Sequence, residues 1–385
     1  MKIPYARPDV TPDDVQAVVD VLQNDWLTQG PLQERFEATV ATYAGVHHAV
    51  AVSSGTAALH LLYLAMGLEP GKTIWTSPNT FVATANAAYC CGAAADFVDI
   101  DSRTYNLSPD SLSQKLKTHA KELPFLIVPV HFAGQSCAME EISLLARRYG
   151  IAVVEDASHA IGGTYQGQPV GCCRWSDAAV LSFHAVKIIT SGEGGMILTN
   201  RSDLYEKLIR LRSHGITRRP ELFRQPNPGP WYYEQLELGY NYRLTDIQAA
   251  LGLSQTNRIG AYVARRTEIA RKYDQALADL PVIQPWRDPR GSSSWHLYVI
   301  QLATEQIKRT QREIFENLHH AGIGVNLHYI PVHLQPFYQQ LGFRAGDFPE
   351  AEAYYRRAIT LPLFPGLRSD ELAFVIDQLR SNLLS

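Results

Sequence analysis

The residue with the clearest capacity for covalent chemistry is Lys187, in the segment "SFHAVKIITSGEGG" (Ser182–Gly195). Apolar residues flank the lysine on both sides, which argues against the common alternative, a solvated lysine on a surface loop. The residues before it predict the end of a strand, and Gly192, Gly194 and Gly195 after it permit positive φ and a close approach of the backbone. An amine held in this way can form an imine with a carbonyl compound and can transfer protons.

An acidic residue lies in a comparable place after another predicted strand. In "VVEDASHA", Asp156 follows an apolar run and is expected at the carboxyl edge of a sheet, where α/β folds collect their ligand sites. A carboxylate there could bind a ribose, a metal ion or a protonated ring nitrogen, and His159 could orient it. The pattern is also typical of an aspartate that caps a helix, so this stretch alone leaves the ligand open.

A third stretch, "SSGTAALH", predicts a strand end, a tight turn at Gly55 and a helix that opens at Thr56 and Ala57. Free backbone N–H groups at a helix N-terminus, together with the Thr56 hydroxyl, are well suited to bind a phosphate. An ordinary turn between a strand and a threonine-capped helix would contain the same residues.

Together these stretches suit pyridoxal 5′-phosphate (PLP). PLP needs a lysine to hold its aldehyde as an imine, an acid to keep its pyridine nitrogen protonated, and N–H donors for its phosphate. A carboxylate raises the pKa of the ring nitrogen, and the protonated ring then withdraws electrons from the reacting carbon. Phe81, which follows a further predicted strand, is suitably placed to cover one face of the ring.

The elements that position these residues alternate between strand and helix over the first two thirds of the chain. The strands are apolar runs without a polar alternation, which indicates an α/β fold with a mostly parallel sheet covered by helices on both faces. Seven strands are expected, near residues 48–54, 73–78, 94–101, 125–134, 151–160, 176–184 and 194–200.

We expect a large α/β domain at residues 1–255 and a smaller α+β domain at residues 256–385. About the first 12 residues, although they belong to the large domain, can pack on the smaller one. The Pro-rich segment 218–232 predicts a loop, and a helix is expected to begin near Thr245. In the smaller domain we expect strands at 294–302 and 323–333 and two further helices after the long one that follows residue 256.

Composition excludes several classes of protein. The 35 Lys and Arg residues against 38 Asp and Glu residues give a net charge of −3, so nothing favours nucleic acid or an acidic membrane as a partner. The first residues, "MKIPYARPDV", lack the apolar core of a secretory signal, and the most apolar region, 46–68, is too polar to span a membrane. Five cysteines without a metal-binding spacing predict reduced thiols, no metal site and a cytoplasmic location.

With its motifs in this order, the sequence resembles the DegT/DnrJ/EryC1/StrS family of sugar aminotransferases. The resemblance covers essentially the whole chain and rests on "SSGTAAL", "TSPNTFVATANA", "EDASHA", "SFHAVKIITSGEGG" and "GYNYRLTDIQAALGLSQ". It implies a fold-type-I PLP enzyme that acts on keto-sugar nucleotides.

Within the family, "DWLTQGP", "VHFAGQSC" and "SFHAVKIIT" most resemble the members that act in pseudaminic acid biosynthesis. This resemblance implies transfer of the amino group of L-glutamate, which becomes 2-oxoglutarate, to a UDP-linked 4-keto-6-deoxy-N-acetyl-hexosamine. The acceptor would be UDP-2-acetamido-2,6-dideoxy-β-L-arabino-hex-4-ulose, aminated at C4.

The resemblance also implies a role for each matching residue. Lys187 matches the lysine that holds the cofactor aldehyde, and Asp156 matches the partner of the pyridine nitrogen. Asn241, in "GYNYRLTD", matches a residue that reaches the phosphate in the neighbouring subunit, which implies a homodimer at least. The other cofactor-binding positions are Gly55, Thr56, Ala57, Phe81, Ser158, His159 and Ser182, and positions lining the sugar-nucleotide site are Tyr5, His328 and Tyr329.

Four alternatives have to be distinguished from this interpretation. A sugar dehydratase of the same family would have histidine in place of Lys187. An aminotransferase that acts at C3, or on a dTDP- or GDP-sugar, would keep the motifs. A dinucleotide-binding oxidoreductase is disfavoured because "GEGGMI" lacks the Gly-x-Gly-x-x-Gly pattern and precedes a strand. A non-catalytic descendant of the family would be expected to lose the lysine or the acid, and both are present.

Overall fold

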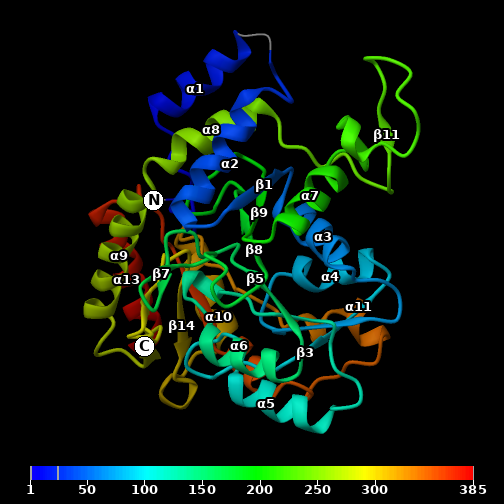
Figure 1. Ribbon diagram of the computed structural model, residues 1–385. Helices are drawn as coiled ribbons and strands as arrows, with labels where there is room; N and C mark the ends of the chain where they lie inside the picture. Colours follow the sequence, from blue (N-terminus) through cyan, green and yellow to red (C-terminus); the bar gives the residue numbers. More distant parts are fainter. Residues whose placement is uncertain (1, 24–25, 385) are drawn as a thin grey trace.

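The computed structural model describes residues 2–23 and 26–384 and is organised around a seven-stranded sheet (Figure 1). Asp25, the first residue of the "DWLTQGP" motif, lies outside the described residues. The strand order is β1-β9-β8-β5-β4-β2-β3, and β9 alone among these seven runs antiparallel to its neighbours. The strands are β1 (His48–Val52), β2 (Thr73–Thr76), β3 (Ala94–Phe97), β4 (Leu126–Val128), β5 (Ala152–Asp156), β8 (Ala178–Ser182) and β9 (Gly195–Thr199). The mostly parallel seven-stranded sheet is therefore confirmed.

Both faces of the sheet are buried, which explains the unbroken apolar runs. Successive side chains of a strand point to opposite faces, so Val50 and Ala51 of β1 belong to different hydrophobic clusters. The face with Val50 packs against α3 (Gly55–Met66), α4 (Ala83–Cys90) and α7 (Ser202–Leu211). The opposite face packs against α2 (Pro31–Ala44), α5 (Pro109–Thr118), α6 (Met139–Arg148) and α8 (Asp246–Thr256).

Capping residues fix where the helices begin. The Ser54 side chain accepts a hydrogen bond from the Ala57 N–H (3.1 Å), so α3 starts directly after β1. A capping box of Thr245 and Gln248 opens α8 as the sequence predicts, and Thr11 with Asp14 does the same for α1 (Pro12–Leu22). The N-terminus of α3 is consequently held at the carboxyl edge of the sheet.

The C-terminal part has an antiparallel sheet of its own, formed by β12 (Val282–Ile283), β14 (Tyr298–Leu302) and β15 (Ala358–Leu361). Helices α9 (Ile259–Ala276), α10 (Gln311–His320) and α13 (Ser369–Leu384) pack against it. Ile3 is part of this core, and its N–H donates to the Gly322 carbonyl (2.9 Å). The division at residue 256 stays a prediction, because α9 contributes side chains to the cores of both sheets.

The strand predicted over 323–333 is wrong. Only isolated bridges form there, from Ile323 to Ile3 and from Asn326 to Thr360, and Val332–Leu334 is a 3-10 turn. The edge of β14 is occupied by β15, a strand that was not predicted. Because residues 327–331 follow no ladder, His328 and Tyr329 are free to line a cavity instead.

Several short elements complete the described chain. Two further helices were expected after α9, and the described chain has four: α10, α11 (Pro336–Gln340), α12 (Pro349–Tyr355) and α13. A small sheet joins β6 (Thr164–Tyr165), β7 (Gln168–Pro169) and β13 (Gly291–Ser292). The Pro-rich loop lies between β10 (Ile216–Thr217) and β11 (Glu234–Gln235) and stands away from the body beside α7 (Figure 1). Within residues 2–23 and 26–384, no helix is both long and apolar enough to cross a membrane.

Candidate active site

A cavity of about 550 Å³ opens at the carboxyl edge of the large sheet. Strands β1, β5 and β8 all end at this edge, because each of them runs in the same direction. Of the thirteen residues predicted from the sequence, eleven line the cavity: Tyr5, Gly55, Thr56, Phe81, Asp156, Ser158, His159, Ser182, Lys187, His328 and Tyr329. Ala57 and Asn241 are not among its lining residues.

The loop that carries Lys187 is held tightly against the start of α3. It connects β8 to the antiparallel β9, and the register pairs Gly195 with both Ser182 and Val52. A Cβ on Gly195 would overlap the backbone of Ser54, so the close approach requires glycine. Gly192 turns the loop with φ +79°. The lysine and the N-terminus of α3 are thus parts of one packed unit.

Burial changes the acid–base behaviour of Lys187. The side chain is half-buried, and burial lowers the pKa of its amine from 10.5 to about 8, although the nearby negative charge of Asp156 acts in the opposite direction. At neutral pH a usable fraction of the amine is therefore unprotonated. Such an amine can attack a carbonyl carbon and can also accept and return a proton.

Asp156 ends β5 and is only 4% exposed. Its carboxylate accepts hydrogen bonds from the Thr84 hydroxyl (2.7 Å) and from the Ser158 N–H (3.1 Å). The expectation that His159 orients this carboxylate is wrong, because the His159 Nε2 instead shares a hydrogen bond with the Tyr329 hydroxyl (3.0 Å). Thr84 was missed because nothing in the sequence shows that the first turn of α4 faces the end of β5.

The start of α3 and Ser182 lie side by side, as a phosphate-binding corner would require. Gly55 and Thr56 are the first residues of α3, so their N–H groups have no acceptor within the helix. Gly55 packs closely on Ser182, since a Cβ on Gly55 would be 3.1 Å from the Ser182 Cβ. The Ala57 N–H is already bonded to Ser54, which leaves it unsuited to the predicted phosphate contact.

Two predicted residues lie at the boundary of the site or beyond it. Phe81 is at the mouth of the cavity, 57% exposed, with its ring centroid 6.1 Å from that of Tyr329. Asn241 is exposed and forms an isolated bridge with Ser213. This position leaves the Asn241 side chain available to another chain rather than to its own cavity.

The wall opposite α3 is rich in aromatic and imidazole groups. The His328 Nδ1 shares a hydrogen bond with the Thr360 hydroxyl (2.9 Å), and burial beside Lys187 lowers the pKa of His328 to about 3. The His159 ring centroid is 4.4 Å from that of His296. Lining residues that the sequence analysis did not single out include Thr80, Thr84, Glu193, His296 and Asn326.

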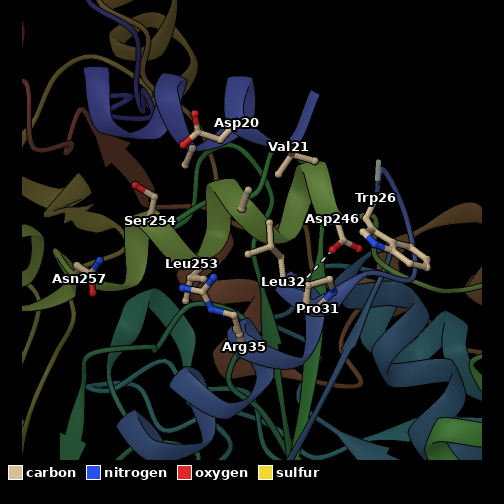
Figure 2. A pocket seen from close by; sticks show the side chains of 12 residues that line it. Asp20, Val21, Trp26, Pro31, Leu32, Arg35, Asp246, Leu253, Ser254 and Asn257 are labelled. Carbon is tan, nitrogen blue, oxygen red and sulfur yellow. Dashed lines mark hydrogen bonds between the residues drawn. The ribbon is translucent and has the colours of Figure 1, made fainter. Parts of the chain in front are cut away.

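A second cavity, of about 600 Å³, lies between α1, α2 and α8 (Figure 2). The Asp246 carboxylate in it accepts hydrogen bonds from the N–H groups of Gly30 (2.9 Å) and Leu32 (3.1 Å), so it joins the start of α8 to the start of α2. None of the thirteen predicted residues lines this cavity. We therefore take the cavity at the sheet edge as the candidate active site.

The residues present fit PLP. The cavity combines an amine of lowered pKa, a buried carboxylate and N–H donors at the start of a helix, which are the groups that bind the aldehyde, the ring nitrogen and the phosphate of this cofactor. Among the described residues, no group of three or more His, Cys, Asp or Glu could hold a metal ion. The fold and the site define a PLP-dependent enzyme of the α/β class.

Comparison with known proteins identifies the family. Residues 8–380 match the DegT/DnrJ/EryC1/StrS aminotransferase family, and the chain belongs to it. The protein is therefore a PLP-dependent sugar aminotransferase.

Individual relatives match over nearly their whole length. The chain is 40% identical to the spore coat polysaccharide biosynthesis protein SpsC of Bacillus subtilis, over 98% of this chain and 96% of SpsC. Its fold matches that of PseC from Helicobacter pylori, an aminotransferase involved in the biosynthesis of pseudaminic acid, with a TM-score of 0.92, 32% identity and coverage of 100% and 99% of the two chains. The PLP form of the sugar aminotransferase Spr1654 from Streptococcus pneumoniae matches with a TM-score of 0.89, 29% identity and coverage of 99% and 98%.

Proposed function

We propose that the protein transfers the amino group of L-glutamate to C4 of a UDP-linked 4-keto-6-deoxy-N-acetyl-hexosamine in pseudaminic acid biosynthesis. The observation that carries this proposal is the similarity to Helicobacter pylori PseC over the whole of both chains. The sequence motifs that resemble members of this pathway support it independently.

PLP, when bound, supplies an aldehyde that condenses with amines and a ring that stabilises negative charge on the adjacent carbon. Lys187 would hold the aldehyde of bound PLP, and its amine, when free, would accept and return a proton. A pKa of about 8 suits this work, because near neutral pH the amine can both accept and release the proton. The same exchange serves L-glutamate in one half of the cycle and the keto-sugar in the other.

The other cofactor residues orient the ring. Asp156 keeps a positive charge on the ring nitrogen, and the hydrogen bond from Thr84 fixes the carboxylate that does so. Ser182 and the N–H groups of Gly55 and Thr56 bind the phosphate. This anchoring leaves Lys187 as the mobile group of the site.

The substrate residues lie on the opposite wall and at the mouth. Tyr5, His328 and Tyr329 line the sugar-nucleotide site, and the Tyr5 and His328 ring centroids are 5.6 Å apart. Phe81 would cover one face of a bound cofactor ring and Ser158 would lie against the other; both line the cavity. His159 contributes to the cofactor site through its hydrogen bond with Tyr329.

The proposed enzyme acts as a homodimer in the cytoplasm. Exposed Asn241 lies outside the cavity of its own chain and is assigned to the phosphate site of the second subunit. The neighbouring Pro-rich loop carries Trp231, which is 74% exposed and therefore available to a second copy. Five unpaired cysteines fit a reducing compartment.

A second candidate is another aminotransferase reaction on a nucleotide sugar, at C3 or on a dTDP- or GDP-linked substrate. It is favoured by the identity of 40% with SpsC, a protein named for spore coat polysaccharide biosynthesis. The residues that bind PLP would be the same for both candidates. The candidates differ only in the sugar nucleotide that binds against the wall around His328.

A substrate panel distinguishes the two candidates. Purified protein loaded with PLP is incubated with L-glutamate and, separately, with UDP-, dTDP- and GDP-linked 3- and 4-keto sugars, and release of 2-oxoglutarate is followed by a coupled assay. NMR of the product then gives the aminated carbon and its configuration. The proposal predicts efficient turnover of the UDP-linked 4-keto-6-deoxy-N-acetyl-hexosamine with amination at C4. Preference for any other sugar, with the named one inactive, would refute it.

A further inference from the structure

His296 is a buried histidine in the wall of the active-site cavity whose ring has no hydrogen-bond partner in the described part of the chain. It is 3% exposed and lines the cavity, and its Nδ1 is fully enclosed without a partner. A buried imidazole without a partner is costly, because its N–H group loses its hydrogen bonds to water. The other ring nitrogen, Nε2, is not among the enclosed atoms, so a bound ligand that accepts a hydrogen bond from Nε2 would remove part of this cost.

The backbone around His296 is held in place by several independent contacts. The buried Arg266 guanidinium donates hydrogen bonds to the carbonyl groups of Trp295 (3.1 Å) and His296 (3.3 Å). The Ser294 hydroxyl donates to the His159 carbonyl (3.0 Å), which joins this segment to the one that follows Asp156. Trp295 has φ +55°, an unfavourable conformation for a bulky residue. The ring of His296 is therefore presented to the cavity by a rigid frame.

Two cations act on His296. Burial lowers the pKa of His296, and the charges of Lys187 and Arg266 lower it further. Burial also lowers the pKa values of the neighbouring His159 and His328. Within the described residues that line the cavity, the acids are Asp156 and Glu193, and Lys187 is the sole lysine or arginine. Lys187 is assigned to the cofactor aldehyde, and no arginine is among the described residues that line the cavity. No lysine or arginine of this chain therefore remains there to bind the carboxylate of an amino-acid substrate.

We propose that His296 donates a hydrogen bond to a carboxylate oxygen of the amino donor and thereby orients the donor for its exchange with Lys187. This inference rests on the proposed function, in which L-glutamate is the donor. Neutral imidazole suits the task, because it is a hydrogen-bond donor that adds no fixed charge to a site that must afterwards accept a sugar. His296 would then determine the affinity of the enzyme for L-glutamate.

The test is an equilibrium titration of the PLP-loaded protein with 2-methyl-L-glutamate, followed by the absorbance of the cofactor. This compound keeps both carboxylates of glutamate but has no α-hydrogen, so it binds without turnover. His296→Phe keeps a planar ring without the N–H donor, and His296→Gln restores an N–H donor near the position of Nε2. His333→Asn is a control outside the cavity: His333 is also buried with an unpartnered Nδ1, although its Nε2 shares a hydrogen bond with Glu352, and it does not line the cavity.

We expect His296→Phe to raise the Kd about 10- to 100-fold, which is the range for loss of a hydrogen bond to a charged group. His296→Gln should stay within about threefold of the wild type, and His333→Asn should leave the Kd unchanged. A Kd for His296→Phe within about twofold of the wild type would overturn the inference, as would an equal loss in the Gln variant. If His296→Phe does not fold, the comparison of wild type with His296→Leu decides on the same criteria.

The wild-type response to L-glutamate separates this inference from the proposed function. If glutamate produces no change in the cofactor absorbance of the wild type, the proposed donor reaction itself fails. If the wild type responds and His296→Phe responds with the same concentration dependence, the proposed function stands and the role of His296 is rejected.

Discussion

Replacement of Lys187 by Met is expected to abolish transamination and, without the cofactor, to stabilise the protein. The loss of activity follows from removal of the amine. The gain in stability follows from the lowered pKa of this amine, which shows that the folded chain holds the charged form less favourably than water does. Met fills a similar volume with a flexible apolar side chain, so the packing of the loop changes little.

The magnitude follows from the two pKa values. A fall from 10.5 to about 8 corresponds to about 3 kcal/mol, at about 1.4 kcal/mol per pKa unit. The unfolded chain binds the proton more tightly than the folded chain, so this cost is fully present below pH 8 and disappears as the pH rises toward 10.5. The cofactor-free Lys187→Met protein should therefore be about 2 to 3 kcal/mol more stable than the wild type at pH 7, and about half as much at pH 9.5.

Urea unfolding of both cofactor-free proteins at the two pH values measures this difference. Lys115→Met is the control for a paired lysine, because Lys115 is half-buried and its Nζ lies 2.6 Å from the Asp96 Oδ2 and 2.6 Å from the Phe97 carbonyl oxygen. Burial lowers the pKa of Lys115 as well, although the charge of Asp96 acts in the opposite direction. Because that substitution also removes both contacts, it should stabilise the cofactor-free protein less than Lys187→Met does. Equal stability of wild type and Lys187→Met at pH 7, or a difference that does not change with pH, would refute the reasoning about Lys187. With PLP present the order should reverse, because only the wild type gains the covalent link to the cofactor.

Three further experiments test the rest of the site. Thr84→Val removes a hydrogen bond to the Asp156 carboxylate and should weaken PLP binding about 10-fold, measured by fluorescence titration of the cofactor-free protein. Gly195→Ala places a Cβ against the backbone of Ser54 and Gly55 and should cost about 1 to 3 kcal/mol, measured as a lower urea midpoint. Asn241→Ala and Lys187→Ala, each inactive alone, should regain about a quarter of wild-type activity when equal amounts exchange subunits, since half of the dimers then contain one intact site; no recovery after verified exchange would contradict a shared site.

The parts of the fold that follow from local pattern could be predicted from the sequence. Apart from the edge strand β3, in which Asp96 is only partly buried, the strands of the large sheet are buried on both faces, so their apolar runs are visible without a structure. The start of α8 was visible because Thr245 and Gln248 form a capping box within four residues. The strand wrongly expected at 323–333 has the same apolar composition as a real one, and only long-range competition from β15 for the edge of β14 excludes it.

The site residues also divide into those that local sequence pattern predicts and those that only tertiary packing brings to the site. Lys187, Asp156 and Thr56 follow strand ends, so their position at one edge of a parallel sheet follows from chain order. Thr84 and His296 contact the site through tertiary packing, from a helix and from a segment more than a hundred residues after Lys187. Tertiary packing also explains why the partner predicted for Asp156 was wrong. Proximity in sequence suggested His159, whereas the packing of α4 places Thr84 against the carboxylate.

The antiparallel strand β9 explains why the lysine and the phosphate-binding corner act together. A sheet with only parallel strands would carry the chain away from the edge after β8, whereas β9 starts at that edge and is paired on both sides. Its first residue, Gly195, lies between the end of β1 and the end of β8, directly against the backbone that begins α3. Any change that moves this loop therefore shifts Lys187 and the N–H groups of Gly55 and Thr56 together. For this reason we expect Gly195→Ala to reduce the affinity for inorganic phosphate as well as for PLP, whereas Thr84→Val should reduce the affinity for PLP alone.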